Sequence, residues 1–237
     1  MDINREDTIL IIAAHPDDEV LGCGGTVKML ANKYGKDLSI NCLILSEPLT
    51  SRASASLSFN ESDLESVIND SKNACKLLGI KNTYYENLPC NRLDSMDLLD
   101  VINVVENYIT RLKPTIVFSH HRFDLNLAHR ITSQAVLTAC RPLPECTVRK
   151  LLSFEIASST EWAFPIYSNV FSPNVFVEIY DSINTKIQAM ECYKTECREY
   201  PHPRSPKAIK AIALRWGSIA NLNYAEAFEL IYERCTI

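Results

Sequence analysis

Continuous apolar runs alternate with segments of helical periodicity along the first part of the chain. The runs are apolar on both faces, which is typical of strands inside a parallel sheet. They are 8–14 (TILIIAA), 38–45 (LSINCLIL) and 115–121 (TIVFSHH). The helices expected between them are 24–35, 61–79, 95–114 (with Ser95 as N-cap) and 128–141, with a further short strand near 83–86. This alternation predicts an α/β, Rossmann-like fold with a mostly parallel sheet and helices on both faces.

The pattern becomes less regular beyond Pro142. The segments 151–156 and 174–179 predict two further strands, and an aromatic loop that contains Trp162 joins them. The remainder, 181–237, is expected to be mostly helical. No linker, repeat or low-complexity tract divides the sequence. We therefore expect a single domain over 1–237 with a more irregular C-terminal half.

Composition and charge exclude several classes of protein. The net charge of −5 leaves no basic stripe with which to follow a nucleic-acid backbone. No apolar segment has the roughly 18 residues that stable membrane insertion needs, and the acidic, polar N-terminus MDINREDT is not a secretory signal. The nine cysteines form no CxxC pair, which favours reduced core thiols over a disulfide framework. These features predict a cytoplasmic protein that binds neither nucleic acid nor a bilayer.

Two polar clusters follow two of the predicted strands. HPDDE at 15–19 comes directly after the strand 8–14, and the histidine pair 120–121 ends the strand 115–121. Ligands of open α/β sheets bind beyond the carboxyl ends of the strands, so both clusters are expected at one site. Three adjacent acids repel one another there, and a bound cation would offset this repulsion. The alternative, in which the acids only cap the next helix, leaves the histidines unexplained.

Imidazole and carboxylate groups together suit zinc or iron(II). His15 and Asp18 are the candidate ligands from the first cluster, and His129 is the candidate third ligand from elsewhere in the sheet. Two further histidines compete with it for that place: His120 and His121. Asp17, which is adjacent to Asp18, is suited to act as general base on a metal-activated water.

The segment AAHPDDEVLGCGGTV at 13–27 resembles the signature of the PIG-L/LmbE-like zinc-dependent de-N-acetylases. These enzymes remove acetyl from N-acetylglucosamine units of lipids, thiol precursors, antibiotics and other glycoconjugates. Four more segments are similar to features of the family or of one bacterial branch of it: SEPLTSR at 46–52, HHRFDLNLAHR at 120–130, YPHPRSP at 200–206 and YAEAF at 224–228. The resemblance therefore spans nearly the whole chain.

Carried over by position, the resemblance implies roles for five residues. His15, Asp18 and His129 would hold the metal, which in the family is Zn²⁺, and Fe²⁺ is an alternative. Asp17 would be the base that activates the water. Arg52, at the end of the segment that follows the second strand, would bind the substrate through a sugar hydroxyl or an anionic group.

The second motif departs from the family at two positions. Family members commonly have an acid or an asparagine immediately before the last metal histidine, where this chain has Ala128; Asp124 or Asn126 is then the candidate to orient His129. Many members also have a histidine three residues before that ligand, and here the position is Asn126. Asparagine can donate a hydrogen bond to an oxyanion, so we assign Asn126 a catalytic role, but it cannot supply a proton.

Another group must therefore protonate the leaving amine. Asp17 is one candidate, since it could return the proton that it takes from water. The other residues expected to line the substrate site, some of them able to give a proton, are His120, His121, Asp124 and His202.

The sequence thus predicts a zinc-dependent hydrolase that removes an acetyl group from an N-acetylated amino sugar by attack of a metal-activated water. The expected partner is a small soluble substrate, such as a nucleotide-linked sugar or another glycoconjugate. One alternative is an amidohydrolase for another acyl, formyl or carbamoyl amide. A degenerate, metal-free binding module is a second alternative, motivated by Ala128. Compact α/β enzymes of this type often self-associate, so a homo-oligomer stays open.

Overall fold

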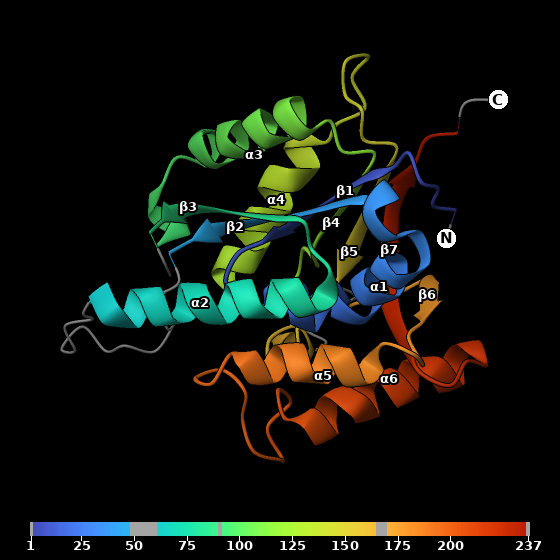
Figure 1. The fold of residues 1–237 in the computed structure, drawn as a ribbon. Coiled ribbons are helices and arrows are strands. Elements are labelled where there is room, and N and C mark those ends of the chain that lie inside the picture. The colour runs from blue at the N-terminus through green and yellow to red at the C-terminus, as the bar shows by residue number, and fades with distance from the viewer. Residues whose placement is uncertain (1, 48–60, 90–91, 165–169, 236–237) are drawn as a thin grey trace.

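The structure of the protein is a computed structural model that describes residues 2–47, 61–89, 92–164 and 170–235. Its centre is a seven-stranded sheet in the order β3-β2-β1-β4-β5-β7-β6 (Figure 1). The strands are β1 (Thr8–Ala13), β2 (Ser39–Ser46), β3 (Asn82–Leu88), β4 (Ile116–His120), β5 (Lys150–Phe154), β6 (Val175–Glu178) and β7 (Ala225–Glu233). The first five are parallel, and β7 runs antiparallel between β5 and β6. The predicted α/β fold with a mostly parallel sheet is confirmed.

Helices cover both faces of the sheet (Figure 1). They are α1 (Asp18–Tyr34), α2 (Glu61–Leu78), α3 (Leu98–Leu112), α4 (Leu127–Ala139), α5 (Ile183–Cys192) and α6 (Pro206–Ala220), with short 3₁₀ turns η1 (Gly35–Asp37), η2 (Leu93–Ser95) and η3 (Glu161–Ala163). Helices α3 and α4 lie on one face, and α1, α2 and α5 lie on the other. Helix α6 packs beside α5 and against β6 and β7.

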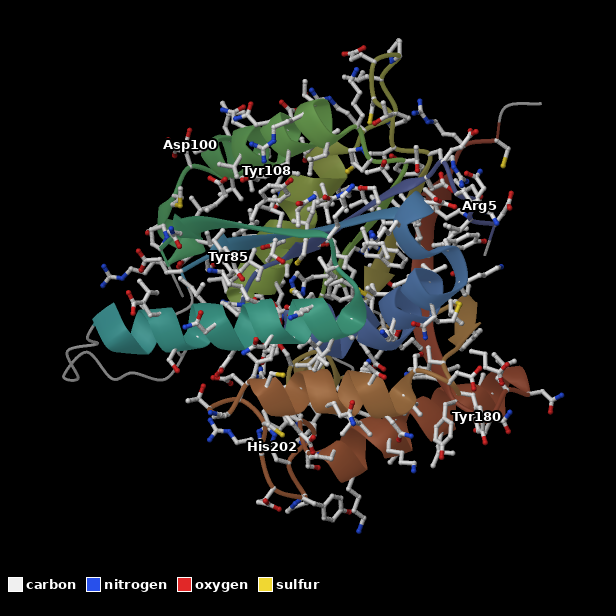
Figure 2. The ribbon with its side chains drawn as sticks, viewed as in Figure 1. Arg5, Tyr85, Asp100, Tyr108, Tyr180 and His202 are labelled. Atoms are coloured by element: carbon white, nitrogen blue, oxygen red, sulfur yellow. The ribbon has the colours of Figure 1, made fainter. Side chains whose placement is uncertain are left out.

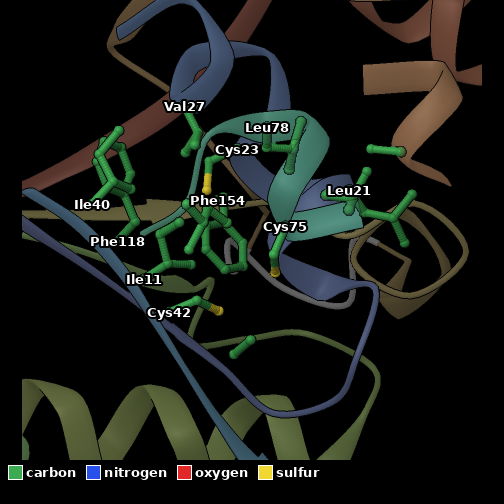
Figure 3. Packing of buried hydrophobic residues seen from close by; sticks show 14 of the residues in the cluster. Ile11, Leu21, Cys23, Val27, Ile40, Cys42, Cys75, Leu78, Phe118 and Phe154 are labelled. Atoms are coloured by element: carbon green, nitrogen blue, oxygen red, sulfur yellow. The ribbon is translucent and has the colours of Figure 1, made fainter. Parts of the chain in front are cut away.

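Alternate residues of β1 enter two different cores. Ile9 and Ile11 belong to the cluster under α1, α2 and α5, whereas Leu10 and Ile12 belong to the cluster under α3 and α4. All four side chains are fully buried. Figure 3 shows part of the first cluster, in which Cys75 of α2 faces the sheet. Because both faces of β1 are covered, the strand is apolar throughout, and charged side chains can follow only where it ends.

Helix α1 begins at Asp18, six residues before the expected start at Gly24. The expected start was wrong because Gly22, Gly24 and Gly25 have low helix propensity, and tertiary packing outweighs propensity here. A Cβ atom on Gly22 would lie 2.5 Å from the ring of Phe154. The glycine therefore lets the first turns of α1 lie directly on the sheet, which brings the acidic cluster to its carboxyl edge.

Helix α3 begins at Leu98 after Asp97, so the expected N-cap at Ser95 is also wrong. Ser95 belongs to the 3₁₀ turn η2, and its hydroxyl donates to the carbonyl of Arg92 at 2.7 Å. Serine satisfies backbone groups locally in turns as readily as at helix ends, and a sequence pattern does not distinguish the two.

The largest correction concerns residues 225–233. They belong to the remainder, 181–237, that was expected to be mostly helical, but they form β7. The strand pairs with β5 on one side and β6 on the other, and Phe228 is fully buried. Two ladders of backbone hydrogen bonds and a buried aromatic ring outweigh the helical propensity of the segment.

Two global features complete the description. None of the helices within the described ranges is both long enough and apolar enough to cross a membrane. The eight cysteines in the same ranges are all free thiols, and four of them are buried.

Candidate metal and catalytic site

The two polar clusters meet at the carboxyl ends of β1 and β4, which are neighbours in the sheet. His15 and Asp18 follow β1, and His120 is the last residue of β4. His129 lies in the first turn of α4, at the end of the loop that leaves β4. Segments separated by more than a hundred positions in the sequence therefore share one site, as expected for an open α/β sheet.

Three side chains at this edge form a compact triangle of ligand atoms. His15 Nδ1 lies 3.3 Å from His129 Nε2 and 3.5 Å from Asp18 Oδ2, and His129 Nε2 lies 3.4 Å from Asp18 Oδ1. Among the described residues, this is the group of histidine, cysteine and acidic side chains that could hold a metal ion. Asp18 and His129 are 1% exposed, whereas the His15 side chain is 13% exposed, so solvent reaches the triangle from the side of His15.

The size of the triangle fits a small transition metal. Two ligands placed at 2.0–2.1 Å on a tetrahedral zinc ion are about 3.3 Å apart, close to the separations observed here. Two imidazoles and one carboxylate are also a donor set that zinc and iron(II) accept. A zinc ion held by these three side chains would keep a fourth coordination position for water or substrate, as catalytic rather than structural zinc sites do.

Charge at the triangle also favours a cation. Burial alone would lower the pKa of His129, but the carboxylates of Asp18 and Asp124 outweigh burial and raise it to about 10. Burial would likewise raise the pKa of Asp18, but His129 and His120 hold it well below its usual range. A positive charge between these groups is therefore strongly stabilised, and a metal ion can supply it in place of the proton.

Asp124 lies behind His129. Its Oδ1 is 3.1 Å from His129 Nδ1, on the side of the ring away from the triangle. Both of its oxygens are further engaged by the hydroxyls of Ser159 and Thr160, and the amide of Asn126 donates to Oδ1 at 2.8 Å. Asp124 is 1% exposed. These contacts favour a role in orienting the His129 ring over the predicted contact with substrate.

His120 is close to the triangle but is turned to the backbone. The amide of Ala14 donates to His120 Nε2 at 2.9 Å, so that nitrogen uses its lone pair within the protein. The ring stacks on His129 with centroids 4.1 Å apart. Burial lowers the pKa of His120 to about 3, which keeps the ring neutral. His120 therefore supports His129 by packing, and its Nε2 is not free to bind a metal.

His121 points to a different part of the sheet. Its Nδ1 is 2.8 Å from Glu229 Oε2 on β7, and its ring packs edge-on against Phe123 and Phe171. Ser153 of β5 donates to the same Glu229 oxygen at 2.9 Å. This cluster connects the end of β4 to β7, and the structure does not bring His121 into the triangle.

Asp17 lies beside the triangle and is paired with a distant arginine. Arg204, in the loop between α5 and α6, donates from Nη1 to Asp17 Oδ2 at 2.7 Å and to Glu196 Oε2 at 2.7 Å. Arg204 Nε also donates to the hydroxyl of Ser158 at 2.8 Å. Burial raises the pKa of Asp17 well above its usual value, and Arg204 opposes this rise. The arginine therefore stabilises the charged form of a buried carboxylate next to the ligands.

A sequence profile of the family described as PIG-L: GlcNAc-PI de-N-acetylase matches residues 10–140, which include Asp17 and the whole triangle. The chain belongs to this family. The resemblance stated from the motifs is confirmed.

Individual PIG-L relatives extend the match beyond that segment. An uncharacterized deacetylase of Escherichia coli named YaiS is 28% identical over 201 residues, covering 81% of this chain and 93% of its own. A diacetylchitobiose deacetylase of Thermococcus kodakarensis is 24% identical over 234 residues, covering 96% and 84%. The solved N,N'-diacetylchitobiose deacetylase of Pyrococcus horikoshii superposes with a TM-score of 0.77 at 18% identity, covering 95% of this chain and 84% of that one. The likeness to this structure establishes a shared fold.

Two other predicted residues are held by contacts outside the triangle. Asn126 is the N-cap of α4, where its side-chain oxygen accepts from the amide of Ala128 at 2.9 Å. His202 (Figure 2) lies in the same loop as Arg204; its Nδ1 accepts from the Arg204 amide at 3.1 Å, and its ring packs edge-on against Trp162. Arg52 lies outside the described residues.

The PIG-L motifs did not indicate the residues that the C-terminal half contributes to the site. Arg204 stands inside YPHPRSP, a segment that resembled the family, but nothing in its local sequence pairs it with Asp17. Tyr193, whose hydroxyl donates to Glu19 at 2.5 Å, carries no sequence signal at all. Only the fold brings these side chains to the acidic cluster.

Proposed function

We propose that the protein is a zinc-dependent N-deacetylase that hydrolyses the acetamide of an N-acetylated amino sugar. The observation that supports this most is the triangle of His15, Asp18 and His129. Asp17, the residue before Asp18, is buried and paired with Arg204. The triangle would hold the metal, and Fe²⁺ would fit the same donors. Two findings support an acetamide as the bond that is hydrolysed and a sugar as the substrate: the chain belongs to the PIG-L family, and one of its relatives is a diacetylchitobiose deacetylase.

When bound, the metal supplies a Lewis acid that polarises the acetyl carbonyl and lowers the pKa of a water molecule toward about 7. Asp17 takes the proton of the attacking water. Arg204 engages Asp17 Oδ2, which leaves Oδ1 for this transfer. The side-chain amide of Asn126 donates to the oxyanion, because its capping bond uses only the side-chain oxygen.

We further propose that Asp17 itself returns the proton to the leaving amine. His120 accepts a backbone amide at Nε2, and His121 is paired with Glu229. His202 is held in the loop of Arg204. None of these three contacts places an imidazole proton at the triangle, whereas Asp17 is adjacent to it.

The substrate that fits this proposal is a small, soluble N-acetyl sugar or a nucleotide-linked or other small glycoconjugate. Trp162, next to His202, would stack on a sugar face.

We also propose that 1–237 is one catalytic domain, since Arg204 and β7 of the C-terminal half complete the site and the sheet. The free cysteines support a reducing, cytoplasmic location, and self-association stays a prediction.

The test is acetate release by purified protein that has been stripped of metal and reloaded with Zn²⁺ or Fe²⁺. The panel contains N-acetylglucosamine, N,N'-diacetylchitobiose, a nucleotide-linked N-acetylglucosamine, and N-formyl and N-carbamoyl analogues. We expect metal-dependent acetate release from at least one N-acetyl sugar. Turnover of the formyl or carbamoyl compounds alone would assign another amide. A protein that neither binds metal nor gains thermal stability with zinc would be a binding module.

The assignment of the base is tested with Asp17→Asn. This variant should keep one metal per chain, because Asp17 is not a member of the triangle. Its kcat should fall by about 10²–10⁴-fold, the usual contribution of general base catalysis. Asp7→Asn is the matched control, since Asp7 is also a buried acid paired with an arginine, at the opposite end of β1. A fully active Asp17→Asn enzyme would refute the assignment.

A further inference from the structure

The backbone of Asp17 is held in an unusual conformation. Its φ of 100° and ψ of −25° lie in the left-handed region, which is unfavourable for a residue with a side chain. Asp17 is the N-cap of α1, yet its carboxylate makes no capping bond. Its carbonyl accepts instead from the amides of Val20 and Leu21, at 3.1 and 2.9 Å. The carboxylate is thus not used by the helix, and its Oδ2 accepts from Arg204.

Two buried side chains hold this conformation. The amide of Asp17 donates to Glu19 Oε2 at 3.1 Å, and the hydroxyl of Tyr193 donates to Glu19 Oε1 at 2.5 Å. Glu19 is 0% exposed and Tyr193 is 1% exposed. The thiol of Cys75 on α2 lies 3.9 Å from the same Oε1. Glu19 therefore does not point to solvent at the helix start but is fixed between α2 and the end of α5.

We propose that Glu19 and Tyr193 are positioning residues that keep Asp17 in the left-handed conformation and its carboxylate beside the metal triangle. An aspartate at an N-cap ordinarily adopts an extended backbone and accepts hydrogen bonds from the first helix amides. Without Tyr193, Glu19 loses its strongest anchor, and the Asp17 amide loses a fixed acceptor. The Asp17 carboxylate then turns to the amides of α1. This rests on the proposed function only in treating Asp17 as the base.

The principal variant is Tyr193→Phe, which removes the hydroxyl and keeps the ring. We expect kcat to fall about 10- to 100-fold, since displacement of a catalytic group by about 1 Å has effects of this size. KM and the zinc content should stay unchanged, because the substrate and metal ligands are not touched. A kcat equal to that of the wild type would overturn the proposal, and so would a loss of zinc parallel to the loss of kcat.

A matched control is available elsewhere in the fold. The hydroxyl of Tyr108 donates to Glu86 Oε1 at the same 2.5 Å, and Tyr108 is 8% exposed. It lies on α3, across the sheet from α5 (Figure 2). Tyr108→Phe should lower thermal stability, by less than Tyr193→Phe because its bond is only partly buried, but leave kcat unchanged, because it breaks a tyrosine–glutamate bond far from the site. Equal losses of kcat in both variants would show that the effect of Tyr193 on kcat comes from general stability and not from the position of Asp17, and would overturn the proposal.

Glu19 gives a second, independent test that does not depend on the tyrosine variant being well folded. Glu19→Gln keeps an oxygen for the Asp17 amide and an NH₂ group for the tyrosine oxygen, so kcat should stay within about threefold of the wild type. Glu19→Leu keeps the volume but offers no acceptor, and its kcat should fall as in Tyr193→Phe. A glutamine variant as impaired as the leucine variant would contradict a hydrogen-bonding role.

The structural readout separates this proposal from the proposed function. Crystal structures of the wild type and Tyr193→Phe should show Asp17 with positive φ in the first and negative φ in the second, with its carboxylate on the α1 amides. If the wild type releases no acetate from any sugar, the proposed function fails, and these structures still decide the positioning role. An unchanged Asp17 in Tyr193→Phe would overturn it.

Discussion

The two halves of the chain contribute to the site in different ways. The segment matched by the PIG-L profile, 10–140, contains the triangle that could hold a metal and the proposed base, within two short motifs. The part beyond it supplies no member of the triangle; instead it supplies the groups that hold the motif in place. Arg204 engages the carboxylate of Asp17, and Tyr193 holds Glu19 behind it. The candidate ligands and the proposed base thus come from short sequence motifs. The side chains that hydrogen-bond to Asp17 and Glu19 come from more than 170 positions further along the sequence.

The same division appears further along α1. Glu226 of β7 accepts hydrogen bonds from the amides of Gly25 and Thr26, at 2.8 and 2.7 Å. Lys186 of α5 donates to the Leu21 carbonyl at 2.8 Å and to Glu226 at 2.6 Å. The buried ion pair of Lys186 and Glu226 is therefore hydrogen-bonded to the middle of α1, the helix whose first residue is Asp18. Breaking this pair tests how much the C-terminal half stabilises α1.

The largest effect is expected from Lys186→Met. It leaves the carboxylate of Glu226 buried without its cation, and breaking a buried pair in this way costs about 3–5 kcal/mol of unfolding free energy. Lys150→Met is the control, since Lys150 is paired with Glu233 at 2.8 Å but Glu233 is 28% exposed; its cost should be about 1 kcal/mol or less. Denaturant unfolding measures the free energy of unfolding of both variants. Equal losses would show that the buried pair on α1 stabilises the fold no more than the partly exposed pair does.

The next effect is expected from Arg204→Met. The Asp17 carboxylate loses its charge-assisted hydrogen bond and is less well placed, so kcat should fall about 10- to 100-fold while zinc content is kept. Arg204→Lys, which restores the charge without the planar fork, should recover part of the loss. Steady-state kinetics with metal analysis measure this. An increase in KM at unchanged kcat would instead assign Arg204 to substrate binding.

A smaller effect is expected at Asp124, behind His129. Asp124→Ala removes the carboxylate that orients the ring, and zinc affinity should fall about 10- to 100-fold, as for other outer-shell partners of metal histidines. Competition with a chromophoric chelator measures the affinity. If zinc affinity does not change but KM rises, the original prediction that Asp124 contacts the substrate is favoured.

Asn126 combines a structural and a predicted catalytic role, and Asn126→Ser separates them. Serine caps helices about as well as asparagine, so the free energy of unfolding should change by less than about 0.5 kcal/mol. The amide donor is lost, so kcat should fall about tenfold or more. Full activity would leave Asn126 as a cap alone, with the oxyanion served by other groups.

The smallest effect is expected at the amino end of β1, far from the site. Asp7 accepts from Arg149 at 2.7 Å and from Thr115 at 2.6 Å. Burial would raise the pKa of Asp7, but the hydrogen bonds from Arg149, Asn4 and Thr115 lower it overall. Because its folded pKa lies below the unfolded value, Asp7 stabilises the fold above about pH 3.9, and this contribution is lost as the pH falls through the folded pKa.

In Asp7→Asn, the free energy of unfolding should therefore decrease less steeply as the pH is lowered, while kcat near neutral pH stays unchanged. Urea unfolding at a series of pH values between 3 and 7 is the measurement, with wild type in parallel. A change in kcat would show that the two ends of β1 are coupled, which would weaken the distinction between the site and its scaffold.

The local sequence determined a large part of this protein. The two-faced apolar strands predicted a parallel sheet, since burial on both sides tolerates no polar residue within a strand. HPDDE and the motif that ends at His129 predicted three ligands and a base, because ligand and acid–base chemistry need particular side chains at close spacing. The structure brings the ligand atoms of His15, Asp18 and His129 within 3.5 Å of one another.

The tertiary structure alone decided three things. It made 225–233 a strand, because pairing with two neighbours outweighs helical propensity. It placed His129 in the triangle with His15 and Asp18, whereas Nε2 of His120 accepts the amide of Ala14. It also brought Arg204 and Tyr193 to Asp17. Such contacts depend on how distant segments pack, and no periodicity or spacing along one segment records the packing partner. The candidate ligands and the proposed base could therefore be predicted from the sequence, whereas Arg204 and Tyr193, which contact Asp17 and Glu19, could not.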